Sequence, residues 1–407
     1  MGALSHLRVL DMSRVLAGPW ASQTLADLGA EVIKIERPDS GDDTRAWGPP
    51  WIETSSGDER QSAYFAGANR NKKSVAVNIA DPRGVEIVKE LAASSDIFIE
   101  NFKVGGLKQY GLDYESLRAI NPRLIYCSIT GFGQTGPYAE RPGYDFLIQG
   151  MGGLMSVTGR PDGEAGEGPL KVGVALTDIL TGLYGTVGIL AALEHRAATG
   201  EGQHIDSSLL DVQVACLANQ AMNFLASGQQ PPRLGNGHPN IVPYQDFRTS
   251  DGYLIVTVGN DNQFGRFCDV LGHPEWSKDE RFSTNSARLA NRVTLIPLLQ
   301  EVIANAETAW WLNRLEAAKV PCGPINDLRG VFDDPHVKVR QMRVEIASEE
   351  GRKVPVVANP LKMSASPVEY RTAPPRLGQQ TQEILRSLLN MTDERIVSLA
   401  NELVIRV

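Results

Sequence analysis

The sequence predicts an α/β fold in which a large, doubly wound, Rossmann-like domain is interrupted by a smaller α+β domain. Through the first third of the chain, short apolar segments alternate with helical periodicity, which is typical of a parallel sheet covered by helices. Near residue 228 the composition changes to turn-forming residues, and an α+β pattern follows. We expect residues 1–225 to form the first part of the large domain, 226–335 the small domain with its linkers, and 336–407 a return segment that completes the large domain.

The elements of the first domain follow from short apolar runs and helical spacings. A strand at the N-terminus leads into a helix that ends at Gly29, a residue that commonly ends helices. The next strand starts directly afterwards and completes a compact βαβ unit. The predicted strands are 7–12, 31–36, 96–100 and 124–129, and the predicted helices are 20–28, one marked by Val85, Val88 and Leu91, and 114–120.

The rest of the chain is predicted in the same way. Residues 228–239 are rich in glycine, proline and asparagine and indicate a linker or an active-site loop. The predicted elements around this loop are helices 176–198 and 209–227, strand 253–258, helices 262–271 and 308–319, a strand after 354 and a terminal helix from 379.

Composition argues against several classes of protein. The 407 residues include 40 Lys and Arg against 48 Asp and Glu, which gives a net charge of −8. A nucleic-acid partner is not expected, because phosphate backbones are bound by clustered positive charge. The four cysteines form no CxxC pair, so we expect no metal site. No apolar run reaches the roughly 18 residues of a membrane span, and we expect a cytoplasmic protein without a membrane partner.

Two loops carry candidate anion-binding groups. The loop after the first strand has one glycine, Gly18, where a dinucleotide-binding turn has three, so that class of site is not indicated. Backbone N–H groups at the start of the next helix are still suited to an anionic or polarised group. Arg37, after the second strand, suits a phosphate, although a solvated arginine is the more common case. The basic segment 69–73 fits a phosphate-facing loop and a solvated turn equally well.

The segment Glu100-Asn101-Phe102 ends a buried strand. Open α/β sheets bind ligands at the carboxyl ends of their strands, so an aromatic ring there is suited to stack on a base. The alternative for Phe102 is a core residue.

Asp178 is the most informative single residue. It lies at the start of an apolar, glycine-punctuated helix, and a carboxylate is costly to bury there without a partner or a task. A desolvated carboxylate can act as a nucleophile, and the alternative is that Asp178 caps the helix. His238 is a second candidate, but no Ser or Cys elbow accompanies it and a loop-packing histidine is the more common case.

These segments together resemble the class III CoA-transferases, the CaiB/BaiF family. The resemblance covers essentially the whole chain, and so many ordered motifs argue against chance. The matching residues are 9–19, 25–38, 41–45, 69–72, 100–102, 121–125, 130–133, 141–145, 178, 188–194, 235–239, 320–325 and 377–381. The resemblance implies an enzyme that moves coenzyme A from an acyl-CoA to a free carboxylic acid, with CoA as a substrate and no tightly bound cofactor.

The resemblance implies covalent catalysis by Asp178. Its carboxylate attacks the donor thioester to give a mixed anhydride and CoA thiolate, and the thiolate then forms an aspartyl-CoA thioester. The acceptor acid displaces this thioester, and the returning thiolate gives the new acyl-CoA. Such intermediates divide one difficult exchange into easier steps.

The resemblance also implies roles for other residues. Those matching contacts to CoA or to the catalytic carbonyl are Val15, Leu16, Ala17, Arg37, Val77, Asn78, Ala80, Asn101, Phe102 and Arg141. Those matching the acyl pocket or the glycine loop that covers it are Trp47, Tyr64, Tyr144, Gly235, Asn236, Gly237 and His238. Family members form interlocked, ring-like homodimers, and we expect the same of this chain.

Some residues depart from the pattern of the formyl-CoA:oxalate members. Leu16 stands where some members have Gln, and Gln109, beside Lys108, where some have Arg. The pattern of residues 235–244 is most similar to the succinyl-CoA-dependent dicarboxylate branch. The alternatives are an α-methylacyl-CoA racemase of the same fold and a CoA-binding protein without catalysis. The racemases carry Gly-His-Asp where this chain has Gly143-Tyr144-Asp145, and a phenol is a poor base near neutral pH.

Overall fold

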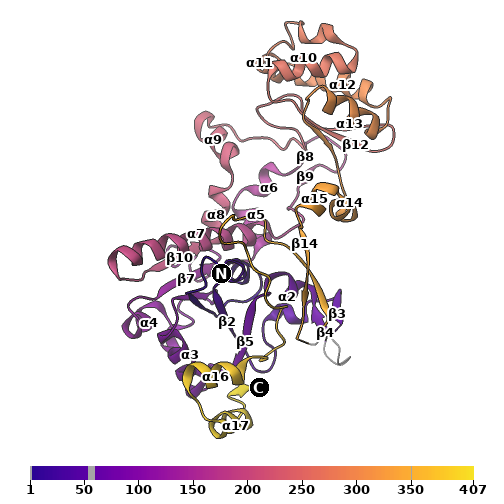
Figure 1. Cartoon of the computed structure of the whole chain (residues 1–407). Coiled ribbons are helices and arrows are strands. Elements are labelled where there is room, and N and C mark those ends of the chain that lie inside the picture. The colour runs from indigo at the N-terminus through magenta and orange to yellow at the C-terminus, as the bar shows by residue number, and fades with distance from the viewer. Residues whose placement is uncertain (1, 54–59, 350) are drawn as a thin grey trace. The chain divides into compact units, whose positions relative to one another are not determined.

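The computed structural model describes residues 2–53, 60–349 and 351–407. The chain folds into two compact units. The first comprises residues 1–153, 172–216 and 336–407, and the second comprises 154–171 and 217–335. The N-terminal strands and the C-terminal helices therefore belong to the same unit (Figure 1).

A seven-stranded sheet forms the centre of the first unit, in the order β10-β7-β6-β1-β2-β5-β16. All neighbours are parallel except β16 and β5. The chain moves outward from β1 through β2 to β5, and then returns to place β6 on the other side of β1. This order confirms the predicted α/β fold with a mostly parallel sheet, and it creates a crevice where the loops after β1 and β6 diverge. The strands are β1 (Arg8–Asp11), β2 (Glu31–Glu36), β5 (Lys72–Val77), β6 (Ile97–Glu100), β7 (Ile125–Thr130), β10 (His204–Ser208) and β16 (Ile405–Arg406).

Helices cover both faces of this sheet (Figure 1). One face packs against α3 (Pro82–Ala93), α4 (Tyr114–Ile120), α16 (Thr381–Leu389) and α17 (Asp393–Asn401). The other packs against α1 (Ala17–Asp27), α7 (Leu176–Thr199) and α8 (Leu209–Ala215). Gly182 lets α7 approach α1 closely, because a Cβ there would lie 2.5 Å from the Ala17 carbonyl oxygen. The start of α7 is thus held beside the start of α1.

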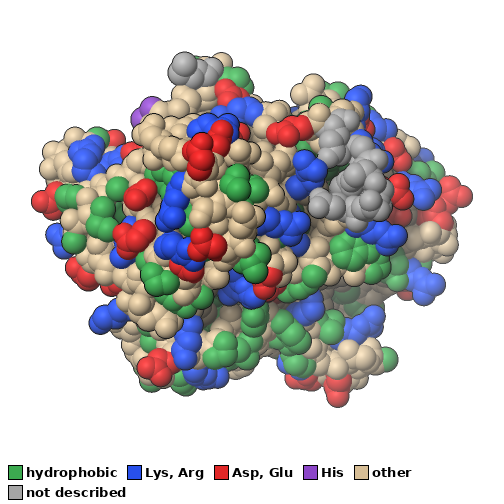
Figure 2. Space-filling view, turned by 90° about the horizontal axis from the view of Figure 1, so that it is seen from below, with side chains coloured by type: hydrophobic (Ala, Val, Ile, Leu, Met, Phe, Trp, Pro, Cys, Tyr) green, Lys and Arg blue, Asp and Glu red, His purple; other side chains and the backbone are tan. Residues whose placement is uncertain are grey.

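Helix α7 is long and apolar enough to cross a membrane by length and composition alone. Core helices of soluble proteins pass the same test, and α7 buries Ile189 and Ala192 in the core shared with α1 and the sheet. Figure 2 shows one face of the molecule, on which basic and acidic side chains are interspersed.

The second unit is built on a three-stranded antiparallel sheet, β11 (Tyr244–Arg248), β12 (Tyr253–Thr257) and β13 (Cys322–Pro324). Its core includes Phe264, Leu299 and Trp311, which lie on α10 (Asp261–Leu271), α12 (Arg292–Ile303) and α13 (Thr308–Ala317). The strand and helices predicted at 253–258, 262–271 and 308–319 are all present.

Two predicted elements differ from the structure. Helix α1 begins at Ala17 instead of residue 20. Pro19 fits in its first turn, because proline has no N–H group and the N–H groups of a first helical turn have no acceptor within the helix. The helix predicted over 209–227 is two helices, α8 and α9 (Ala218–Ser227), because the backbone of Ala218, at the start of α9, has a φ of +46°. The antiparallel pairing of two short strands, β3 (Trp51–Glu53) and β4 (Arg60–Ser62), was not predicted.

Candidate active site

The crevice at the carboxyl ends of β1, β6 and β7 contains a cavity of about 430 Å³. It lies where the strand order reverses, which is the usual ligand site of an open α/β sheet. Eight of the predicted site residues line it: Val15, Leu16, Ala17, Asn101, Phe102, Arg141, Tyr144 and Asp178.

Asp178 lies in the first turn of α7 and is half-buried. The N-cap of this helix is Ala175, so the interpretation of Asp178 as the cap is wrong. Asp145 instead holds the start of α7: its Oδ1 accepts the backbone N–H of Thr177 at 2.9 Å and that of Asp178 at 3.4 Å. These bonds leave the Asp178 carboxylate available to the cavity.

Burial raises the pKa of Asp178 to about 7, and the charge of Asp145 adds to this shift. A raised pKa makes the carboxylate more basic and keeps much of it protonated at neutral pH. Perturbed carboxyl groups in clefts are typical of catalytic sites.

We expect this pKa to appear in the pH dependence of the reaction. Only the carboxylate form of Asp178 is nucleophilic, so kcat/KM should fall about tenfold per pH unit below pH 7. Asp145→Asn removes the neighbouring charge but keeps an oxygen acceptor. It should therefore lower the pKa of Asp178 and move the acidic limb of the kcat/KM profile to lower pH. Steady-state kinetics from pH 5 to 9 test this prediction. A limb that does not move in Asp145→Asn would contradict it.

The loop between β1 and α1 presents free backbone donors to the same cavity. Within the part of the chain that the structure describes, the N–H groups of Leu16 and Ala17 donate to no other group. They stand at the N-terminus of α1, where the helix dipole favours negative charge. Such donors suit the oxyanion of an acyl-transfer intermediate.

The side chain of Asn101 is occupied by this loop. Its Oδ1 accepts the Arg14 N–H at 2.9 Å, and its Nδ2 donates to the Arg14 carbonyl at 2.7 Å. Phe102 lines the cavity and packs, partly buried, against the core. The Arg14 guanidinium lies 5.6 Å from the centre of the Phe102 ring and pairs with Asp43 at 3.0 Å.

Two further predicted pocket residues, Trp47 and Tyr64, pack edge to face with their ring centres 5.2 Å apart. Burial raises the pKa of Tyr64, and the charges of Asp178 and Asp145 raise it further. Tyr64 is therefore within electrostatic reach of the nucleophile candidate. On the cavity wall, the Arg141 guanidinium lies over the rings of Phe132 and Tyr138, at 5.2 and 4.6 Å from their centres.

The remaining predicted CoA contacts lie elsewhere in the first unit. Arg37 and Asn78 line a separate cavity of about 530 Å³ together with C-terminal residues that include Arg406. Arg37 also pairs with Asp39 at 2.7 Å. The side chain of Val77 is buried in the core, whereas Ala80 is exposed.

The four residues of the predicted glycine loop belong to the second unit. Gly235 has a φ of +58°, which favours glycine. Asn236 donates to Asp246 at 3.0 Å, and Gly237 donates to the Leu234 carbonyl at 2.9 Å. The His238 ring accepts the Asn240 N–H at 3.0 Å and lies near Tyr244, which fits a loop-packing histidine.

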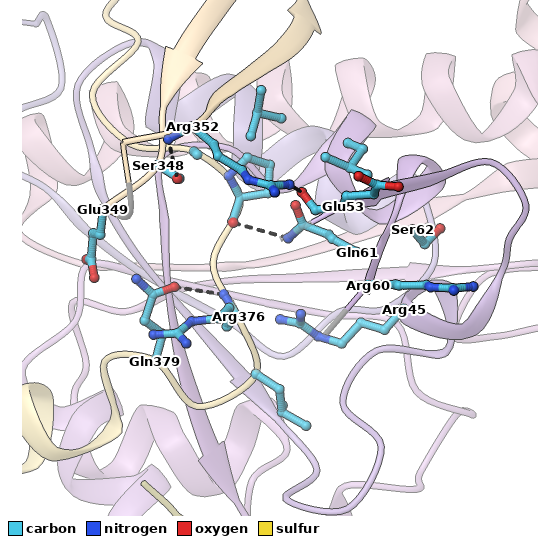
Figure 3. A pocket seen from close by; sticks show the side chains of 15 residues that line it. Arg45, Glu53, Arg60, Gln61, Ser62, Ser348, Glu349, Arg352, Arg376 and Gln379 are labelled. Carbon is cyan, nitrogen blue, oxygen red and sulfur yellow. Dashed lines mark hydrogen bonds between the residues drawn. The ribbon is translucent and has the colours of Figure 1, made fainter. Parts of the chain in front are cut away.

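A third cavity in the first unit, of about 220 Å³, contains none of the predicted site residues (Figure 3). Its lining includes Arg45, Arg60, Arg352 and Arg376, and Arg45 pairs with Glu36 at 2.7 Å. Among the described residues, no cluster of three or more His, Cys, Asp or Glu side chains could hold a metal ion.

A buried ionic network beneath the β1–α1 loop was missed. It joins Lys34 to Asp42 at 2.9 Å and Lys72 to Asp11 at 3.1 Å, and all four side chains are at most 1% exposed. A signal was present in the sequence, because Lys34 lies between Ile33 and Ile35 within a strand of a sheet covered on both faces. A charge in that position must find a partner.

The chain is similar to known proteins over most of its length. Residues 4–381 match the family described as CoA-transferase family III. The chain is 51% identical over 390 residues to the succinate–glutarate CoA-transferase of Agrobacterium fabrum, covering 95% of each protein. It is 45% identical over 393 residues to the succinyl-CoA:glutarate CoA-transferase of Homo sapiens, covering 97% of this chain and 87% of the human protein. A crystal structure of a CaiB/BaiF family protein from Brucella suis matches with a TM-score of 0.84 and 51% identity, covering 95% of this chain and 99% of that one. The chain therefore belongs to the class III CoA-transferases, the CaiB/BaiF family, and is an enzyme of the CoA-transferase type.

Proposed function

We propose that this enzyme transfers CoA from succinyl-CoA to a dicarboxylic acid such as glutarate, with Asp178 as the nucleophile. One observation carries the proposal: Asp178 shares a cavity with the unpartnered N–H groups of Leu16 and Ala17. The names of relatives at 45 to 51% identity support the choice of substrates.

The reaction proceeds by exchange at acyl carbons. The Asp178 carboxylate attacks the thioester carbonyl and expels CoA thiolate, which leaves a mixed anhydride. The thiolate attacks the aspartyl carbonyl, releases the donor acid and forms an aspartyl-CoA thioester. The acceptor carboxylate attacks that thioester and expels the thiolate, which then attacks the acceptor carbonyl of the new anhydride and restores Asp178. The Leu16 and Ala17 N–H groups stabilise the oxyanion formed at each attack.

Other residues of the first unit bind the substrates in this proposal. CoA contacts Arg37, Asn78, Ala80, Asn101, Phe102 and Arg141, and Val15 supports the donor loop. Val77 is buried in the core and makes no such contact. Trp47, Tyr64 and Tyr144 surround the acyl group.

Arg141 tests the proposed CoA contacts. Among the described residues it forms no ion pair with a carboxylate, although it lines the cavity. Arg141→Gln should raise the KM for succinyl-CoA and glutaryl-CoA alike, by about 10- to 100-fold, because a charge-assisted bond to a phosphate is lost. Arg141→Lys is the matched control and should lose less. If the KM for the free acid rises instead while that for acyl-CoA does not, Arg141 binds the acceptor carboxylate.

The proposal includes a cytoplasmic, interlocked homodimer. Exposed apolar side chains on α7, among them Leu183, Tyr184 and Val187, form a face that a second copy would cover. Sedimentation equilibrium tests the dimer, and a monomer at micromolar concentration would contradict it.

The transfer itself is tested with a panel of acids. Purified enzyme and succinyl-CoA are mixed with glutarate or other dicarboxylic and monocarboxylic acids, and the CoA products are identified by mass spectrometry. We expect glutaryl-CoA and free succinate in equal amounts. Hydrolysis without transfer, or no reaction with any acid, would contradict the proposal.

A further inference from the structure

Val15 has a backbone conformation that calls for an explanation. Its φ is +72°, in the left-handed region that β-branched residues rarely adopt. It lies directly before the two free N–H groups, and it lines the cavity that contains Asp178. Strain of this kind persists only where the surrounding structure holds it.

The Asp42 carboxylate holds Val15 in this conformation. The Val15 N–H lies 3.2 Å from Asp42 Oδ1 and 3.3 Å from Oδ2. Asp42 is buried, and its Oδ1 also accepts the Thr44 N–H at 3.0 Å and the Thr44 hydroxyl at 2.8 Å. The Lys34 ammonium lies 2.9 Å from Asp42 Oδ2 and donates to the Ser13 carbonyl at 2.7 Å. Lys34 thus ties the loop and Asp42 together.

The surroundings of Asp42 keep its carboxyl group ionised. Burial opposes ionisation, but Lys34 and the Thr44 N–H together hold the pKa of Asp42 below its usual range. Its backbone N–H donates to Glu36 at 3.0 Å, and Glu36 in turn binds Arg45, which lines the cavity in Figure 3. The carboxylate therefore has a fixed position on a rigid, charge-paired support.

We propose that Asp42 is a positioning residue of the CoA-transferase reaction. It holds Val15 in the left-handed conformation and so fixes the Leu16 and Ala17 N–H groups in the Asp178 cavity. The inference rests on the proposed function, because these N–H groups act on the oxyanion. Small errors in the position of such donors cost large factors in rate.

Asp42→Asn keeps the shape of the side chain but places an amide beside Lys34 and leaves fewer acceptor sites for four donors. We expect kcat for succinyl-CoA and glutarate to fall about 100-fold, with KM for succinyl-CoA changed less than about threefold, since the donors act in the transition state. Glu86→Gln, on the exposed surface of α3, is the control and should keep wild-type kcat.

The decisive variant is the double substitution Val15→Gly/Asp42→Asn. Glycine adopts a φ of +72° without strain, so the loop no longer depends on Asp42 to stay in place. We expect the double variant to regain about tenfold in kcat over Asp42→Asn, and Val15→Gly alone is measured beside it, so that the cost of Asp42→Asn is compared in the Val15 and Gly backgrounds. A role of Asp42 in general stability would give no such rescue.

Three outcomes separate the claims. If wild type exchanges CoA but Asp42→Asn keeps its kcat, or the double variant shows no rescue, the positioning role is wrong and the proposed function stands. If wild type itself shows no exchange, the proposed function fails first. If Asp42→Asn does not fold, Thr44→Val takes its place, because it removes only the hydroxyl bond to Asp42. It is measured with and without Val15→Gly, and Val15→Gly must again restore kcat.

Discussion

Asp178→Asn should abolish CoA exchange, with a loss in kcat of at least about 10⁴-fold. An amide has nearly the shape of the carboxylate but is a very poor nucleophile, so neither the anhydride nor the aspartyl thioester forms. The pocket itself should remain intact, because the described contacts at the start of α7 are made by the backbone of Thr177 and Asp178 with Asp145. Binding of CoA should therefore persist.

The measurement is exchange of labelled succinate into succinyl-CoA, with CoA affinity determined by calorimetry. Glu86→Gln is the matched control, because it makes the same carboxyl-to-amide change on an exposed helix face. A CoA-binding protein without catalysis would show no exchange in either form. A racemase would instead exchange the α-hydrogen of a branched acyl-CoA in heavy water without an added acid, and that result would contradict the transferase mechanism.

Asp27→Ala should lower the free energy of unfolding by about 3–5 kcal/mol, because it leaves a buried arginine without its counter-ion. Both Asp27 oxygens bind the Arg70 guanidinium, and they also accept from Asn71 at 2.9 Å and Asn359 at 3.1 Å. Asp27 is fully buried and Arg70 is 4% exposed. The network joins the end of α1 to the segment that returns from residue 336 onward.

Urea unfolding followed by circular dichroism measures this loss. Glu86→Ala is the control: it breaks the exposed pair with Lys89 in α3 and should cost less than about 1 kcal/mol. A similar small cost for Asp27→Ala would mean that the return segment is held to α1 mainly by other contacts, such as the bonds from Arg371 to the carbonyls of Ala26, Gly29 and Ala30.

The parallel sheet could be predicted because its signals are local. Residues 31–36 form a strand at the predicted bounds, and the start of α7 lies at the predicted Leu176, because apolar runs and helical spacing decide these elements. The start of α1 was placed too late, since a proline such as Pro19 is typical of loops but is tolerated in a first helical turn. The last strand, β16, pairs with β5 across more than half of the chain, and no local pattern indicates such a pairing.

Only part of the candidate site could be predicted from the sequence. Asp178 is detectable because a carboxylate is unusual in an apolar helix start. The side chains that bind the loop between β1 and α1 are not detectable in this way. Asp42 accepts a hydrogen bond from the backbone of Val15, and Asn101 accepts one from the backbone of Arg14. These bonds depend on how three loops meet in the folded chain. Asp145, which sets the start of α7, is likewise separated from it by more than thirty residues.

Covalent labelling of Asp178 tests the central claim most directly. The enzyme is incubated with succinyl-CoA without an acceptor, treated with hydroxylamine and digested, and the peptides are read by mass spectrometry. Hydroxylamine converts an aspartyl thioester or anhydride to a hydroxamate, so we predict a hydroxamate on Asp178 in wild type and none in Asp178→Asn. An unmodified Asp178 in enzyme that transfers CoA under the same conditions, or a hydroxamate on another carboxyl group, would contradict Asp178 as the nucleophile.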